Sequence, residues 1–94
     1  MDIKKGFASA LKKIRKAKKL TQEDFSDSSS RTYLSILERG LKSPTLEKVD
    51  ALAKTLEVHP LTLLTVAYSK IDGRDHNEIL QTVTEQIRQI EKIS

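Results

Sequence analysis

The sequence predicts an all-α protein, with five short helices within residues 1–70 and one longer amphipathic helix after them. Apolar residues recur at spacings of three and four along most of the chain, and no stretch alternates as a half-buried strand would. Capping residues, glycines and prolines mark the ends of these periodic segments. The 94 residues suffice for one domain, or for one small domain with an appendage.

The first two helices are predicted from an apolar stripe and a capping residue. Thr21 is a suitable N-cap for the second helix, whose acidic first turn suits the helix dipole. This second helix is short and should end near Asp27. The stripe of the first helix consists of Phe7, Ala10, Leu11, Ile14 and Ala17.

The third helix has two well-marked ends. Ser30 can cap its start, and Gly40 follows its last periodic residue, where a left-handed C-terminal cap is expected. Leu34 and Leu37 point inward. Ile36, however, falls on the polar outer side, which raises the question of what an isoleucine contacts there.

Prolines start the next two helices. Ser43-Pro44 opens the fourth, with Pro44 at the first helical position, and His59-Pro60 opens the fifth. Asp72-Gly73 ends the fifth helix. The inward stripes are Leu46, Val49, Leu52, Ala53 and Leu56 in the fourth helix, and Leu61, Leu63, Leu64 and Ala67 in the fifth.

The last helix, about residues 75–93, carries a wider apolar stripe than a five-helix core needs. We expect residues 1–70 to form one domain and residues 71–94 to be a dimerisation element, the alternative being that this helix folds back on its own domain. Two heptads are too few to predict a coiled coil. The residues of the stripe are Ile79, Leu80, Val83, Ile87, Ile90 and Ile93.

The net charge of +4 is unevenly distributed. Residues 1–44 hold 11 Lys/Arg and 5 Asp/Glu, whereas residues 45–94 hold 6 and 8. A basic half attracts polyanions such as nucleic acids, although it also serves as an ordinary solvated surface. No apolar run approaches the roughly 20 residues that span a bilayer, and the N-terminus lacks signal-peptide features. We therefore expect a cytoplasmic protein with no membrane partner.

The sequence offers little for catalysis or metal binding. It has no cysteine, and its two histidines are His59, next to a proline at a helix start, and His76. No HExxH motif, phosphate-cradling glycine loop or Ser/His/Asp arrangement occurs. We expect no enzymatic activity, no cofactor and no metal site.

Several short motifs, in order, suggest a family. L-T-Q-E-D-F is followed by S-R-T-Y-L-S-I-L-E-R-G, then by S-P-T-L-E-K-V and L-A-K-T-L-E-V. From Phe7 to Leu64 the chain resembles the lambda-repressor-like helix-turn-helix family, also called the xenobiotic-response-element (XRE) type. The resemblance implies a transcriptional regulator that places its third helix in the major groove of double-stranded DNA, with the start of the second helix on the phosphate backbone.

The resemblance also implies roles for individual residues. Arg15 and Glu38 match positions whose side chains pair across the first and third helices and brace the recognition helix. The base-reading candidates are Arg31, Thr32 and Ile36, which match the family's base-reading positions, and Ser35, which shares their outward face. The phosphate-binding candidates are Thr21, Gln22, Arg39, Lys42 and Ser43.

The resemblance suggests a specific contact for Ile36. Thymine presents a C5-methyl group in the major groove, on which Ile36 could pack while Arg31 contacts a guanine. A stray exposed side chain and a dimer contact are the alternatives.

The sequence departs from the family pattern between Leu20 and Ser30, which is about two residues shorter than usual. No glycine is present in the turn, so Asp27, Ser28 or Ser29 must make the bend. The resemblance therefore does not specify the docking angle of the third helix.

We expect a homodimer on an inverted-repeat operator, with half-site centres about 34–36 Å apart. One alternative is an antitoxin that represses its own operon and also binds a toxin protein. A second is a protein-interaction module that no longer reads DNA. RNA binding is disfavoured because the basic surface lacks interleaved aromatic residues.

Overall fold

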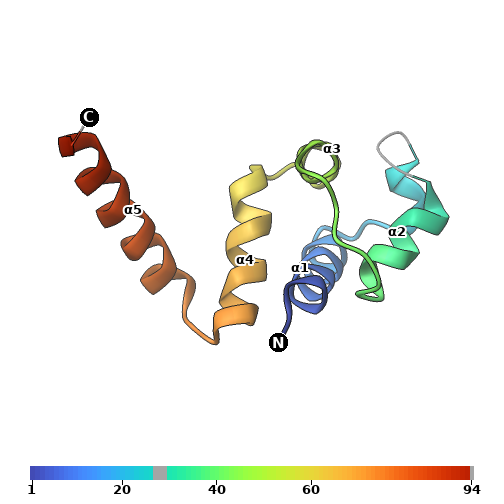
Figure 1. Cartoon of the computed structure of the whole chain (residues 1–94). Coiled ribbons are helices and arrows are strands. Elements are labelled where there is room, and N and C mark those ends of the chain that lie inside the picture. Colours follow the sequence, from blue (N-terminus) through green and yellow to red (C-terminus); the bar gives the residue numbers. More distant parts are fainter. Residues whose placement is uncertain (27–29, 94) are drawn as a thin grey trace.

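The computed structural model describes residues 1–26 and 30–93, and these residues form helices joined by short connections (Figure 1). The described elements and their order along the chain agree with the prediction of an all-α protein with a longer C-terminal helix. The elements are α1 (Ile3–Ala17), the 3-10 helix η1 (Gln22–Phe25), α2 (Arg31–Glu38), α3 (Leu46–Leu56), α4 (Pro60–Asp72) and α5 (His76–Ile93).

Most predicted helix ends are confirmed. The Ser30 hydroxyl accepts a hydrogen bond from the Tyr33 backbone N–H (3.0 Å), and so caps α2. His59 caps α4 through Nδ1, which accepts from the Leu61 N–H (3.0 Å). Gly40 and Gly73 follow α2 and α4 with positive φ angles, +74° and +62°, which glycine adopts without steric cost.

Two boundary predictions need correction. The fourth helical segment, α3, begins at Leu46 and not at Pro44, because the Thr45 hydroxyl, not Ser43, accepts the capping bond from the Lys48 N–H (3.1 Å). The second helix is a single 3-10 turn that ends at Phe25. The bend expected at Asp27, Ser28 or Ser29 lies outside the described residues.

A leucine-rich core joins the first five elements. Helices α1 and α4 pack closely along their lengths, and Gly6 leaves no room for a Cβ against the Ile71 side chain. Phe25 of η1 is completely buried, so the short 3-10 turn is anchored despite its length. The core consists of Phe7, Ala10, Leu11, Phe25, Leu34, Leu37, Val49, Leu52, Leu56, Leu63 and Ala67.

Helix α5 diverges from the rest of the molecule. It packs against α4 near its own start, and the two helices open into a V (Figure 1). Helices α5 and α2 thereby lie toward opposite ends of the molecule, whose longest dimension is 45 Å. This separation leaves the outer side of α2 free of α5.

Candidate nucleic-acid interface

Helix α2 has a buried side and a polar outer side. Its two inward leucines are fully buried in the core. Arg31 and Thr32 in its first turn are exposed, whereas Ser35 and Ile36 are half-buried. Ile36 thus keeps only part of its side chain in solvent, at the edge of the outer side and not at its centre.

Arg31, at the start of α2, is already paired within the protein. Its Nη1 lies 3.1 Å from Oε1 of Glu23 in η1, and the two side chains are 70% and 73% exposed. Such exposed pairs contribute roughly 0–1 kcal/mol, so Arg31 can exchange this partner for another acceptor at little cost. No pattern in the sequence indicates the pairing of Arg31 with Glu23, because a contact between η1 and α2 follows no helical spacing.

A largely buried network lies behind α2. Arg15 Nε donates to Glu38 Oε2 (2.6 Å) and Arg15 Nη2 donates to Glu38 Oε1 (3.0 Å). The third nitrogen, Nη1, donates to the Leu20 carbonyl (2.9 Å), and Gln22 Nε2 donates to Glu38 Oε1 (3.2 Å). The side chains of Arg15 and Glu38 are only 12% and 4% exposed.

The expected pairing of Arg15 with Glu38 is therefore present. The hydrogen bond to Glu38 raises the pKa of Arg15 above its ordinary value, although burial acts in the opposite direction. The network joins the last turn of α1, the start of η1 and the last turn of α2, so any rotation of α2 breaks several charge-assisted bonds.

The phosphate-binding candidates lie on three segments around α2. Thr21 is exposed at the start of η1, where its backbone N–H donates to Asp24 Oδ2 (2.6 Å). The neighbouring Gln22 is half-buried, and its side-chain amide donates to Glu38. Arg39 is exposed at the end of α2, and Lys42 and Ser43 are exposed in the loop that follows.

The two histidines do not form a site together. His59 is occupied in capping α4, as described above, and His76 lies 3.6 Å from the Asp75 carboxylate at the start of α5. Residues 1–26 and 30–93 contain no group of three or more His, Cys, Asp or Glu side chains able to hold a metal ion. Within the same residues, no helix is both long and apolar enough to cross a bilayer.

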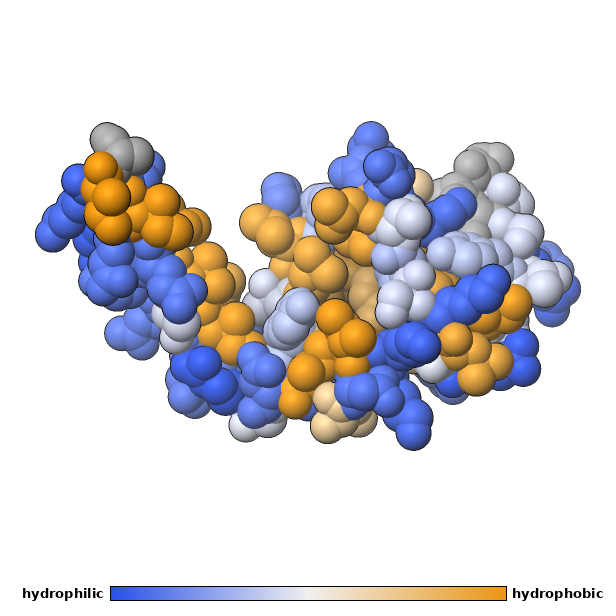
Figure 2. Space-filling view, viewed as in Figure 1, coloured by the Kyte–Doolittle hydropathy of each residue, from blue (hydrophilic) through white to orange (hydrophobic). Residues whose placement is uncertain are grey.

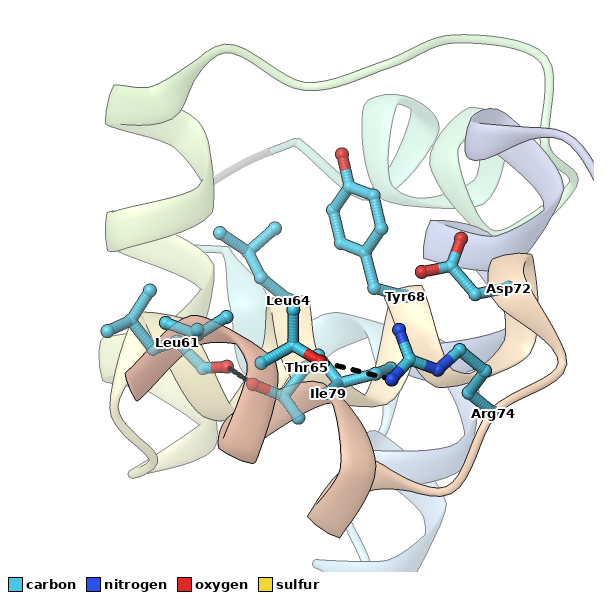
Figure 3. Close-up of a pocket in the computed structure, with 9 residues that line it drawn as sticks. Leu61, Leu64, Thr65, Tyr68, Asp72, Arg74 and Ile79 are labelled. Atoms are coloured by element: carbon cyan, nitrogen blue, oxygen red, sulfur yellow. Dashed lines mark hydrogen bonds between the residues drawn. The ribbon is translucent and has the colours of Figure 1, made fainter. Parts of the chain in front are cut away.

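The apolar stripe of α5 remains largely uncovered. Ile79 is half-buried against α4, but exposure increases from 45% at Leu80 to 87% at Ile93. Figure 2 shows apolar side chains along the side of α5 that faces the body, and more of them on the facing surface. A groove of about 380 Å³ between α4 and α5 is lined by Leu61, Leu64, Thr65, Tyr68, Asp72, Arg74, Ile79, Thr82 and Val83 (Figure 3).

Comparison with known proteins gives concordant results. A family model described as helix-turn-helix matches residues 11–63, from the middle of α1 to the start of α4. Over 67 residues the chain is 40% identical to the uncharacterized HTH-type transcriptional regulator y4dJ of Sinorhizobium fredii (strain NBRC 101917 / NGR234). This match covers 69% of the present chain and 87% of the relative.

Two solved structures share the fold. The clp gene regulator ClgR from Corynebacterium glutamicum superposes with a TM-score of 0.71 at 23% identity, over 96% of this chain and 90% of that one. The restriction–modification controller protein C.Esp1396I gives a TM-score of 0.67 at 29% identity, over 76% and 94%. The first match extends over nearly the whole chain.

Proposed function

Because this chain belongs to the helix-turn-helix family of DNA-binding transcriptional regulators, we propose that it binds an inverted-repeat operator as a homodimer, with α2 in the major groove. The family is one of regulators and not of enzymes. The observation that carries the proposal is the outer side of α2, which presents Arg31 and Thr32 to solvent above a buried leucine anchor. We further propose that the protein acts on double-stranded DNA in the cytoplasm.

We assign base reading to Arg31, Thr32, Ser35 and Ile36. Arg31 is the strongest candidate, since a bidentate arginine–guanine contact discriminates against other bases by about 1–3 kcal/mol. That gain exceeds the loss of the exposed Glu23 pair, about 0–1 kcal/mol. The half-burial of Ile36 supports a contact at the edge of the footprint, where its exposed part can pack on a thymine methyl.

Phosphate contacts are assigned to the segments on either side of α2. The exposed side chains of Thr21, Arg39, Lys42 and Ser43 support this role, and backbone contacts of this kind fix the register of a protein on DNA. For Gln22 the proposal is different in kind. Its side-chain amide donates a hydrogen bond to Glu38. The network behind α2 would therefore also position Gln22 against the phosphate backbone of the DNA.

Dimerisation is assigned to residues 71–94, leaving residues 1–70 as the DNA-binding domain. The support is the stripe of α5, because its distal isoleucines lie beyond the part of α5 that packs on α4 and are exposed in a single copy. A second copy would cover them. The interacting residues we propose are Ile79, Leu80, Val83, Ile87, Ile90 and Ile93.

Selection of bound sequences from random duplex DNA tests this proposal. We expect inverted repeats whose half-site centres lie one helical turn apart, about 34–36 Å. Arg31→Ala should relax the preference at one position of each half-site. Arg88→Ala is the matched control, because Arg88 is also exposed and paired with a glutamate (Glu85) but lies on α5. Recovery of unrelated, non-repeated sequences would contradict the proposal.

The mass of the protein in solution tests the dimer separately. Light scattering should give about twice the 10.6 kDa of one chain, and Ile87→Asp should reduce it to that of one chain. A partner protein, such as the toxin of an antitoxin–toxin pair, is the alternative occupant of the α5 stripe. It would be favoured if the purified protein is monomeric and the stripe binds a copurifying protein of different sequence.

A further inference from the structure

The connection between α4 and α5 is short and extensively bonded. Only Gly73, Arg74 and Asp75 separate the two helices. The Arg74 backbone N–H donates to the Ser69 carbonyl (3.2 Å), and the Ser69 hydroxyl donates to the Arg74 carbonyl (2.5 Å). Ser69 therefore binds both backbone groups of Arg74 and closes the chain into a corner after α4.

The side chain of Arg74 extends this corner into α5. Its Nη2 donates to the Thr82 hydroxyl (3.1 Å) and to the Glu78 carbonyl (3.4 Å), and its Nε lies 3.8 Å from the Glu78 carboxylate. Figure 3 shows Arg74 at one end of the α4–α5 groove, with Leu61 at the other. Arg74 thus links the corner to the first two turns of α5, and the corner resists changes in the angle of the V.

We propose that Ser69 and Arg74 are positioning residues that set the spacing between the two recognition helices of the dimer, and hence the half-site spacing that the operator must have. This inference rests on the proposed dimer. If α5 forms the interface, each DNA-binding domain is attached to the two-fold axis through the α4–α5 corner. The angle at that corner then determines where each α2 lies relative to its partner.

The geometry makes this control sensitive. The 18 residues of α5 span about 27 Å, so a change of about 10° at the corner displaces the far end of the helix by about 5 Å. One base pair corresponds to an axial rise of about 3.4 Å. A corner that yields by about 10° therefore covers the axial part of a one-base-pair change in spacing, and the rotation of about 35° that accompanies the change requires a larger movement at the corner.

The DNA experiment compares the wild type with Arg74→Ala and Ser69→Ala on operators whose half-sites are moved apart or together by one base pair. The wild type should lose about tenfold or more in affinity for a one-base-pair change, which also rotates one half-site by about 35°. The variants should stay dimeric, bind the best spacing less tightly, and show less than a threefold preference for it. Gln89→Ala, on the polar side of α5, should behave as the wild type.

A second readout needs no DNA. The chain has no cysteine, so a spin label on Glu47→Cys, exposed at the start of α3, reports the distance between the two domains of a dimer by pulsed electron resonance. That distance should be narrowly distributed in the wild type and broad with Arg74→Ala. Gly73→Ala, which disturbs the same corner through its positive φ of +62°, should broaden it as well.

The possible failures are distinct. Dimeric variants with narrow distances and the wild-type spacing preference would overturn the role of the corner while leaving the proposed function intact. A monomeric wild type, which gives no signal between domains, would overturn the dimer and this inference together.

Discussion

Removal of Glu38 is the sharpest test of the network behind α2. This carboxylate accepts hydrogen bonds from Arg15 Nε, Arg15 Nη2 and Gln22 Nε2, and its side chain is 4% exposed. Glu38→Ala leaves the Arg15 guanidinium charged and largely buried. Removing one partner of a buried ion pair lowers the free energy of unfolding by about 3–5 kcal/mol. Arg15 keeps its bond to the Leu20 carbonyl and can reach solvent, so we expect a loss of about 2–3 kcal/mol in the free energy of unfolding.

Urea denaturation followed by circular dichroism measures this loss. With a denaturant slope of about 1–3 kcal/mol/M, the midpoint should fall by about 1 M or more. Glu85→Ala is the matched control. Its carboxylate lies 2.6 Å from Nη1 of Arg88, the same distance as in the Arg15–Glu38 pair, but the side chains of both Glu85 and Arg88 are more than half exposed. It should cost less than about 0.5 kcal/mol.

The double variant Arg15→Met/Glu38→Leu removes both charges and keeps apolar volume. It should be more stable than Glu38→Ala alone, because no buried charge is left without a partner. If Glu38→Ala costs no more than Glu85→Ala, or if the double variant is as unstable as the two single losses added together, the pair is not a coupled structural unit.

Three further predictions follow from the described side chains. Glu23→Gln should increase the affinity for DNA several-fold, because it frees Arg31 from its ion pair and removes a negative charge from the proposed DNA-binding side. Unchanged affinity in gel-shift titrations would show that Arg31 does not exchange partners on binding. Glu57 follows α3 with φ of +59°, a left-handed conformation that is costly for any residue except glycine. Glu57→Gly should therefore raise the free energy of unfolding by about 0.5–1 kcal/mol. Equal or lower stability in urea would contradict this. If each subunit neutralises ~4 phosphates, log affinity should fall with log salt at a slope near −7 for the dimer, and a slope near zero would exclude an electrostatic footprint.

The sequence predicted best where one residue type has one physical role. Ser30, Gly40 and Gly73 mark helix ends by hydroxyl capping or positive φ, and all three are at those ends in the structure. The start of α3 was predicted wrongly because both Ser43 and Thr45 can cap a helix and Pro44 fits the first position after Ser43. Only the folded chain decides which hydroxyl meets a free N–H.

Contacts between elements that lie far apart in the sequence were harder to predict. The pairing of Arg15 with Glu38, 23 positions apart, was expected through a family resemblance, since no periodic pattern connects the two residues. The contact of Glu23 with Arg31 and the corner at Ser69 and Arg74 were not predicted. Each depends on how a connection orients two elements, which neither helical period nor capping preference specifies.

The uneven charge of the chain has a consequence now that the elements are arranged in space. The basic half includes α1 and α2, and the half with net charge −2 includes α5 at the opposite end of the 45 Å axis. Within the basic half, residues 1–20 hold 8 Lys/Arg and 1 Asp, whereas residues 21–44 hold 3 Lys/Arg and 4 Asp/Glu, so the positive charge is concentrated on α1 and the turn that follows it. A polyanion is therefore attracted first to α1, and because α1 packs directly against α2, this long-range attraction brings a duplex close to α2 although residues 31–38 carry no net charge.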